Sequence, residues 1–232
     1  MDDRSALLVR LTQILTVTAP RAPLADRLCL AYAEIVGAEG AAITVGYSTP
    51  DRTTLSASDD VATRLEDLQD VLREGPGLDA FRNGSPVVHS RAEQGRLWPM
   101  LQQAMNEHRL DVSLLAFPMK PDSEVLGAIS LYSGAEPDLQ CSIEEAQFLA
   151  DAIGVAILGR FDREESTDAV WATRDRINQA TGMVVAQLSI RSTDALAVLR
   201  AHAYAHGAPL EDVAAAVVSR KLDFKAIEES EG

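Results

Sequence analysis

Histidine and cysteine are the side chains that most often hold a metal ion or act as a nucleophile, so their spacing limits the chemistry open to this chain. His202 and His206 are four residues apart on a predicted helix, a spacing that can hold a metal, but no acidic third ligand lies at a matching position. Cys29 and Cys141 are far apart and belong to no CxxC or Cys/His pattern. We therefore expect no metal site and no disulfide, with histidines at the surface or in packing contacts and inert, buried thiols.

Two other groups of residues could be imagined as a catalytic or phosphate-binding site. His89, Asp79 and Ser90 are residue types of a hydrolytic triad, but the chain has no GxSxG motif and no triad spacing. Residues 75–77, Gly-Pro-Gly, could cradle a phosphate, but no GxxxxGK[ST] motif follows and no strand directly precedes them, so we expect a loop. No cofactor site is identified, and we expect that the protein is not an enzyme.

The C-terminal part of the chain carries cations that could meet the phosphates of a nucleic acid. They are Arg174, Arg176, Arg200, Arg220, Lys221 and Lys225. Arg200 and Tyr204 are four residues apart, so on a helix they share a face and place a charge beside an aromatic ring that could stack on an unpaired RNA base. The alternative for each residue taken alone is a solvated surface group.

The formal net charge of −14 is distributed unevenly. Residues 1–169 contain 14 Lys and Arg against 27 Asp and Glu, whereas residues 170–232 contain 7 against 8. A general electrostatic attraction to nucleic acid is therefore absent. Any such binding must use a local basic face and must be sensitive to salt.

Helical and strand patterns occur in blocks along the N-terminal two thirds of the chain. They predict two helices within 4–36, strands at 40–48 and 53–58, a helix at 60–73, a strand at 85–90, a helix at 98–108, and strands at 113–120 and 125–133. Strands that follow one another as hairpins, instead of alternating with helices, favour an α+β domain built on an antiparallel sheet.

From residue 142 onward the strand patterns cease. Apolar positions within 145–161, the charged stretch 162–168 and a resumed helical pattern predict one long connector helix. Such a helix buries little on its own, so pairing with the same helix of a second copy would stabilise it, and the chain is expected to form a homodimer. The alternative for residues 145–161 is packing on the sheet of their own chain.

The tail after this connector predicts a unit of three helices. The first ends near Leu188, Ser192 can cap the second, Gly207 ends the second, and Pro209 takes the first position of the third. The apolar positions that could form a small core are Val184, Leu188, Ala195, Leu196, Leu199, Ala203, Val213 and Val217.

No run of about 18 apolar residues is present, and the N-terminus begins with acidic residues instead of a signal-peptide core. We therefore expect a cytoplasmic protein without a membrane partner.

Residues 166–222 resemble the ANTAR domain, an RNA-binding antitermination module of three helices. The positions that match its pattern are Arg174, Ile177, Ala180, Gly182, Met183, Ala195, Leu199, Arg200, Ala203, Leu210, Asp212, Val213 and Ala214. The resemblance implies that a dimer binds paired RNA hairpins with small loops, so that a nearby transcription terminator cannot form. On this basis the predicted RNA-binding residues are Arg174, Arg176, Arg200, Tyr204 and Lys221. Members commonly carry Lys where this chain has Thr181, which removes one phosphate contact.

Residues 22–160 resemble a GAF domain of the type that precedes ANTAR in actinobacterial regulators. The residues that carry this resemblance are 74–88, the pair Trp98-Pro99 and the run 117–133. It implies an antiparallel sheet with helices on its faces and, in many members, a pocket for a small molecule. The residues that hold cyclic nucleotides, haem or bilins in other members cannot be identified, so a small-molecule ligand remains an open expectation without an identity.

Gly182 lies inside the first helix of the tail, where glycine costs about 1 kcal/mol relative to alanine. Ala180 and Gly182 both lack bulk, so we expect the second helix to pack closely against this turn. Direct contact of Gly182 with RNA is the alternative.

The expected organisation joins these parts. It comprises an N-terminal helix (1–21), a GAF-like sensor domain (22–143), a connector helix (144–167), an ANTAR-like RNA-binding domain (168–224) and a tail (225–232). The predicted function is an RNA-binding antitermination regulator. The alternative is a ligand-binding or protein-interaction regulator whose C-terminal helices contact a partner protein and not RNA.

Overall fold

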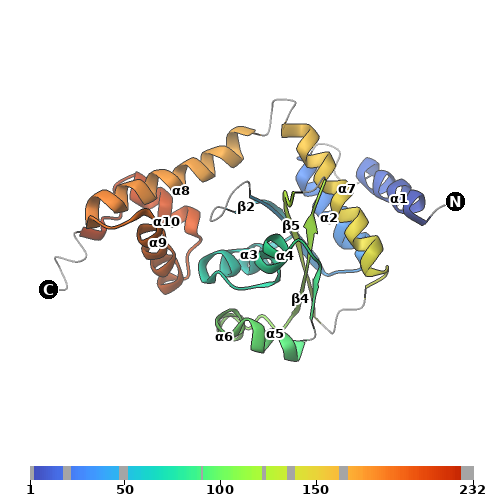
Figure 1. Ribbon diagram of the computed structural model, residues 1–232, viewed down its shortest axis with the longest axis horizontal. Helices are drawn as coiled ribbons and strands as arrows, with labels where there is room; N and C mark the ends of the chain where they lie inside the picture. Colours follow the sequence, from blue (N-terminus) through green and yellow to red (C-terminus); the bar gives the residue numbers. More distant parts are fainter. Residues whose placement is uncertain are drawn as a thin grey trace. The chain divides into compact units, whose positions relative to one another are not determined.

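The computed structural model describes residues 3–17, 22–46, 52–89, 91–121, 124–134, 139–161 and 167–225 (Figure 1). The elements in chain order are α1 (Asp3–Val17), α2 (Leu24–Val36), β1 (Gly40–Val45), β2 (Thr53–Ala57), α3 (Asp60–Leu72), α4 (Pro76–Asn83), β3 (Val87–Val88), α5 (Arg91–Leu97), α6 (Pro99–Glu107), β4 (Ser113–Met119), β5 (Gly127–Ser133), α7 (Ile143–Phe161), α8 (Thr167–Leu188), α9 (Ser192–His206) and α10 (Leu210–Val218). They form two compact units: the second begins after α7 and comprises α8, α9 and α10 together with the short piece Asp70–Leu72 of α3, and the first comprises the rest.

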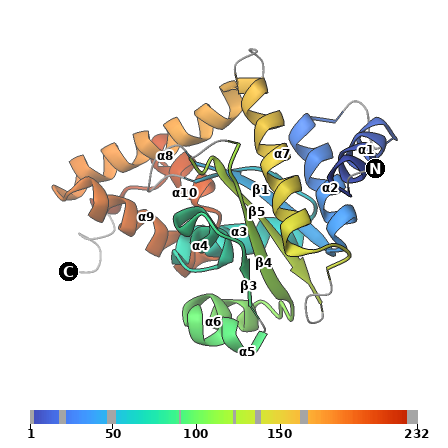
Figure 2. The same cartoon turned by 45° about the vertical axis from the view of Figure 1, so that its right-hand side comes forward.

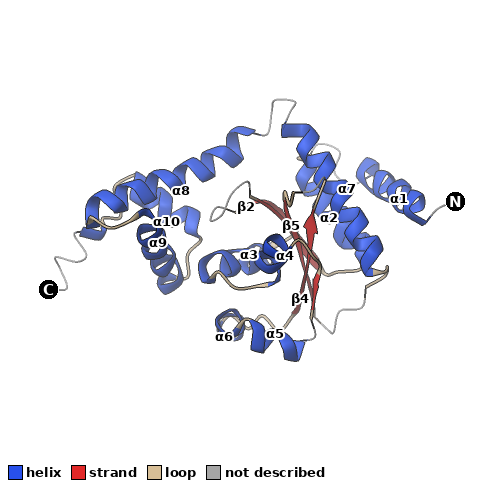
Figure 3. Ribbon diagram, in the orientation of Figure 1, coloured by secondary structure: helices blue, strands red, loops and turns tan. Residues whose placement is uncertain are grey.

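A five-stranded antiparallel sheet is the centre of the N-terminal unit (Figure 3). Its order is β2-β1-β5-β4-β3, so β1 lies between β2 and β5, and β4 lies between β5 and β3. The two hairpins that the sequence predicts, β1 with β2 and β4 with β5, are confirmed. The α+β fold class is confirmed with them.

Alternating side chains of the central strands face two different helical layers, which Figure 2 shows on opposite sides of the sheet. On one side Ile43, Phe117 and Ile129 join the core that α1, α2 and α7 complete, and all three are fully buried. Burying each such side chain contributes about 1.5–3 kcal/mol. On this side Tyr32 of α2 donates a hydrogen bond to the carbonyl of Ala146 in α7, at 3.0 Å. The two helices are thereby fastened to each other over the sheet.

The opposite side of the sheet is covered by α3 and α4. Asp59 caps α3 by accepting a hydrogen bond from the backbone N–H of Ala62, at 2.8 Å. The prediction of a loop at residues 75–77 is wrong beyond Gly75, because α4 begins at Pro76. The backbone N–H of the first helical residue has no partner within the helix, so proline, which lacks this N–H and has a helical φ, is favoured at that position. Pro76 and Gly77 therefore mark the start of a helix here. Gly75 makes the preceding turn with a φ of +133°.

Helix α7 packs its first half on the sheet. Ala146, Leu149, Ala150 and Ile153 are fully buried there. The first half of α7 thus packs on the sheet of its own chain, which is the arrangement that the sequence left open as the alternative to pairing with a second copy. Residues 162–166, through which one continuous helix was expected, lie outside the described residues.

The C-terminal unit is formed by α8, α9 and α10, as the sequence predicts. Its core contains the predicted apolar positions, of which Leu188 is only partly buried, and adds Ala180, Leu210, Ala214 and Phe224. Gly207 ends α9 in the left-handed conformation, with a φ of 59°. No single helix among those described is long and apolar enough to cross a membrane. The segments Arg176–Leu188 and Ser192–His206 reach that length and apolarity only when taken together, and the chain bends sharply between them.

Two local predictions for this unit are wrong. Ser192 does not cap α9: the cap position is Arg191, which makes no capping hydrogen bond with its side chain and instead pairs with Asp194 at 2.9 Å. Pro209 is likewise the cap residue of α10, one position before the helix.

The expected close packing at Gly182 is also wrong. Gly182 is exposed on α8, and a Cβ built there would meet no described atom within 4 Å. Ala180, two residues earlier, is the small residue that the core covers completely. In the described structure, therefore, no neighbouring helix accounts for the glycine.

Candidate nucleic-acid interface and buried polar cluster

The predicted RNA-binding residues come from three elements of the C-terminal unit. Arg174 and Arg176 belong to α8, Arg200 and Tyr204 to α9, and Lys221 to the turn that follows α10. The side chain of Arg174 lies outside the described residues. The remaining four can be placed one by one.

Arg176 is already engaged within the unit. Its guanidinium donates to the carboxylate of Glu211 at the start of α10, at 2.8 Å, and the two side chains are 39% and 46% exposed. An exposed pair of this kind contributes about 0–1 kcal/mol, and a phosphate could compete for the cation at small cost. The pair joins the middle of α8 to the first turn of α10, where a carboxylate is also favoured by the helix dipole.

Arg200 and Tyr204 lie on one face of α9, as their spacing predicts. The Tyr204 side chain is exposed, at 36%. Thr181, at the position where related domains commonly carry Lys, donates its hydroxyl to the carbonyl of Ile177 one turn back in α8, at 2.8 Å. The hydroxyl is therefore used within the helix.

Lys221 is exposed just after α10 and lies at the other end of the unit from Arg176. Close to it along the chain, the rings of Phe224 and His202 are nearly perpendicular, with their centroids 5.2 Å apart, and the backbone N–H of Phe224 donates to the side-chain oxygen of Gln187 in α8 at 3.3 Å. Arg176 and Gln187 are 11 residues apart on α8, which corresponds to about 16 Å along the helix. The predicted residues do not form one compact cluster, and they could contact only an extended ligand together.

His202 and His206 stack on each other, with ring centroids 4.0 Å apart. Partial burial of His202, and then the neighbouring His206, lower the pKa of His202 below its ordinary value of 6.5. Among the described residues no group of three or more His, Cys, Asp or Glu could hold a metal ion. The pair takes part in packing at this end of the unit.

A buried polar cluster, which the sequence did not reveal, lies on the α3 side of the sheet in the N-terminal unit. We define it as Thr44, Arg52, Glu66, Gln69 and Ser130. Arg52 and Glu66 form an ion pair of 2.7 Å, with side chains only 5% and 3% exposed. Because such a pair joins a residue before β2 to one inside a helix, no spacing rule predicts it.

The carboxylate of Glu66 is engaged by three donors. Besides Arg52, it accepts hydrogen bonds from Thr44 at 2.7 Å and from the amide of Gln69 at 2.5 Å. The carbonyl oxygen of that amide accepts in turn from the backbone N–H of Gly77, at 2.9 Å. The cluster therefore connects β1, α3 and the start of α4 and carries no net formal charge.

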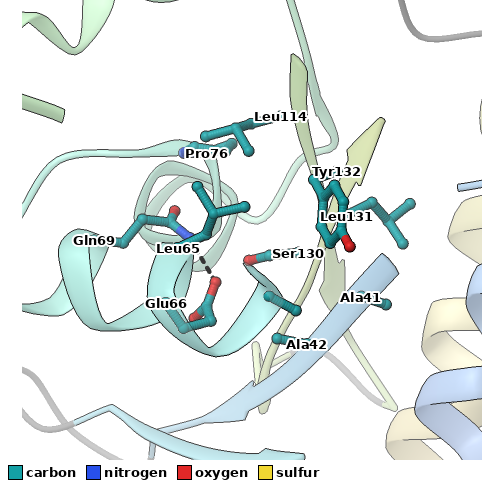
Figure 4. A pocket seen from close by; sticks show the side chains of 11 residues that line it. Ala41, Ala42, Leu65, Glu66, Gln69, Pro76, Leu114, Ser130, Leu131 and Tyr132 are labelled. Carbon is teal, nitrogen blue, oxygen red and sulfur yellow. Dashed lines mark hydrogen bonds between the residues drawn. The ribbon is translucent and has the colours of Figure 1, made fainter. Parts of the chain in front are cut away.

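A small hollow borders this cluster (Figure 4). It is lined by Ala41, Ala42, Ala62, Leu65, Glu66, Gln69, Pro76, Leu114, Ser130, Leu131 and Tyr132. Its empty space is about 230 Å³ counted out to the open mouth, and the part that a water molecule can enter is about 10 Å³. Figure 4 shows the Ser130 hydroxyl pointing from β5 toward α3. This hydroxyl is buried and has no hydrogen-bond partner among the described residues.

Asp79 and His89, which the sequence analysis considered as members of a hydrolytic triad, both contact Trp98. Asp79 accepts a hydrogen bond from the indole of Trp98 at 2.8 Å, and the ring of His89 meets the edge of the same indole at 5.9 Å. Ser90 lies outside the described residues. Cys29 is fully buried, and that burial raises the pKa of its thiol to about 12, so it is unreactive at neutral pH.

Two family models match the chain. The model of the GAF domain matches residues 19–158, and the model of the ANTAR domain matches residues 166–218. No curated protein sequence matches the chain.

Among solved structures, the chain is similar to the A. aeolicus nlh2 GAF domain in an inactive state (16% identity, 69% of this chain, 97% of that chain, TM-score 0.45). It is also similar to a domain assigned to a two-component sensor histidine kinase of Sinorhizobium meliloti 1021 (15% identity, 63% of this chain, 92% of that chain, TM-score 0.41). The third likeness is to the Stigmatella aurantiaca phytochrome photosensory core module (11% identity, 85% of this chain, 44% of that chain, TM-score 0.41). The GAF model alone spans more than half of the sequence, and the ANTAR model follows it directly. The chain belongs to the GAF domain family and carries an ANTAR domain at its C-terminus.

Proposed function

We propose that this chain is a cytoplasmic RNA-binding antitermination regulator, in which the GAF domain senses a signal and the ANTAR domain binds paired RNA hairpins as a dimer. The single observation that carries the proposal is the three-helix unit that the ANTAR family model matches. GAF and ANTAR are regulatory domains, which supports a role without catalysis.

The RNA-binding face is centred on α9. Arg200 and Tyr204 place a cation and a ring on one helix face. The Arg200 side chain is only 13% exposed, so it must turn outward to meet a phosphate while an unpaired loop base stacks on the ring of Tyr204. Arg176 and Lys221 extend this face, and Arg174 is a further proposed contact whose side chain lies outside the described residues. Because the C-terminal segment is close to electrically neutral, binding depends on these local contacts and weakens as salt is added.

The test is a titration of the full chain with a fluorescently labelled RNA that carries two short hairpins. We expect Arg200→Glu to weaken binding by on the order of tenfold or more and to reduce the slope of log K against log salt by about 0.7 to 0.9 per lost phosphate contact. Arg191→Glu is the matched control: Arg191 is a cation of the same unit, 83% exposed and paired only locally with Asp194. The RNA affinity of Arg191→Glu should stay within about twofold of that of the unmodified chain.

Equal RNA affinity of the folded Arg200→Glu variant and the unmodified chain would reject this face. An absence of RNA binding in both would instead favour the second candidate function, a regulator whose C-terminal helices contact a partner protein. The exposed ring of Tyr204 is the observation that keeps this candidate, because aromatic side chains are also enriched in protein interfaces.

A further inference from the structure

Three rings are stacked at the end of α9, and we call them the ring stack. The rings of His202 and His206 lie nearly parallel, with their centroids 4.0 Å apart. The ring of Phe224 stands nearly perpendicular to that of His202, with the centroids 5.2 Å apart, and Phe224 is only 8% exposed. Since His202 is half-buried and His206 is exposed, the ring stack leads from the core of the C-terminal unit to its surface.

The ring of His206 is held in one orientation, with one face open. Its Nδ1 donates a hydrogen bond to the carbonyl of His202 at 2.8 Å, because a carbonyl oxygen can only accept. His202 covers one face of the ring. In a longer helix the side chain four residues further on would cover the other face, but Gly207 ends α9 directly after His206. Because His206 is exposed, this outer face is turned to solvent.

Cations lie close to the ring stack along the chain. Residues 220–225 contain the cations Arg220, Lys221 and Lys225 and the single carboxylate Asp223. Three cations against one carboxylate give this segment a formal charge of +2, and all three cations are exposed. An open ring face beside a positive segment suits an unpaired RNA base, which stacks on the ring while the phosphates next to it meet the cations.

We propose that the open face of His206 stacks on an unpaired base of the bound RNA, and that the cations of residues 220–225 meet the phosphates beside that base. This inference rests on the proposed function and adds a second base-binding position to it. His206 is two residues from Tyr204, and two residues turn about 200° around an α-helix, so the two rings lie on different sides of α9. They therefore hold two different bases of one RNA.

The experiment is a titration of the full chain with the two-hairpin RNA, in which each unpaired loop base is replaced in turn by 2-aminopurine. The emission of this fluorescent base falls when it stacks on a ring. We expect one loop position whose emission falls when the unmodified chain binds and recovers in His206→Ala, together with a loss of affinity on the order of tenfold. Tyr204→Ala should change the emission at a different position.

Two further variants separate the ring of His206 from its polarity. His206→Phe keeps a ring, so its RNA affinity should stay within about threefold of that of the unmodified chain. His206→Gln keeps a polar side chain without a ring, so it should behave like His206→Ala.

His108→Ala is the matched control, because His108 is also an exposed histidine but belongs to the N-terminal unit, where its Nε2 lies 2.7 Å from the guanidinium of Arg64. It should bind RNA like the unmodified chain. The proposal is overturned if folded His206→Ala keeps full affinity and the same emission at every loop position, or if His206→Phe binds as weakly as His206→Ala. If Arg200→Glu weakens binding while the His206 variants do not, only the ring stack is rejected. If the unmodified chain binds no RNA, the proposed function is rejected and the ring stack with it.

Discussion

Arg52 and Glu66 are both charged and both almost fully buried, so replacing one of them alone leaves the other charge buried without its partner. Arg52→Met leaves the Glu66 carboxylate buried without its counter-charge and should lower the free energy of unfolding by about 3–5 kcal/mol. Chemical denaturation measures this change.

The double variant Arg52→Met/Glu66→Gln removes the stranded charge while an amide can still bond to Thr44 and Gln69, so more than half of the loss should be recovered. Arg191→Met, which breaks the exposed pair with Asp194, should change stability by less than about 1 kcal/mol. If Arg52→Met were as stable as the unmodified chain, the account of the cluster would be contradicted.

His202 connects the stability of the C-terminal unit to pH. Burial and the neighbouring His206 lower its pKa in the folded state, so between the folded and the unfolded pKa the unfolded chain binds more protons. The contribution to stability is therefore fully present above the ordinary pKa of 6.5 and is lost as the pH falls below it.

We expect the free energy of unfolding of this unit to decrease as the pH falls below about 6.5, and His202→Gln to remove part of that decrease. Thermal unfolding at several pH values measures it. If the stability of His202→Gln depended on pH as the stability of the unmodified chain does, the pH dependence would come from other groups and the prediction would be wrong.

At the scale of elements, the start of α4 is held by the backbone of a glycine. Gly75 has a φ of +133°, and a Cβ there would collide with the side chain of Gln69. Gly75→Ala should therefore destabilise the N-terminal unit by about 1–3 kcal/mol in denaturant titrations. Gly95→Ala in α5 is the control, because its Cβ would have its nearest neighbour at 3.6 Å; that variant should be neutral or slightly stabilising. Equal effects of the two variants would reject the strained turn.

The same elements show what the sequence could and could not predict. The hairpins β1–β2 and β4–β5 follow from short apolar runs joined by turn residues, a signal that depends on neighbouring residues only. The buried polar cluster depends on Thr44, Arg52, Glu66 and Ser130, which lie far apart in the chain and meet only through the fold. For Gly182 the packing expectation failed because helical spacing tells which residues share a face but not which face is covered.

At the scale of the whole molecule, the proposed dimer needs a surface, and α7 carries exposed apolar side chains. Beyond its buried half, Val155 and Leu158 are 55% and 37% exposed. If the dimer forms through this surface, Val155→Asp in the full chain should shift sedimentation from dimer to monomer, because a charge opposite its own copy is repelled and desolvated. Leu97→Asp on α5, at 50% exposure, is the matched control and should remain dimeric. A dimer that survives Val155→Asp, or a chain that is monomeric throughout, would reject the surface on α7.

The central claim is that the ANTAR domain recognises hairpin RNA beside terminators through α9. Crosslinking of the tagged chain to cellular RNA, followed by sequencing, tests it most directly, with Arg200→Glu beside the unmodified chain. The account predicts enrichment of paired short hairpins next to terminators, and loss of that enrichment in Arg200→Glu. Enrichment no greater in the unmodified chain than in the folded variant would contradict it.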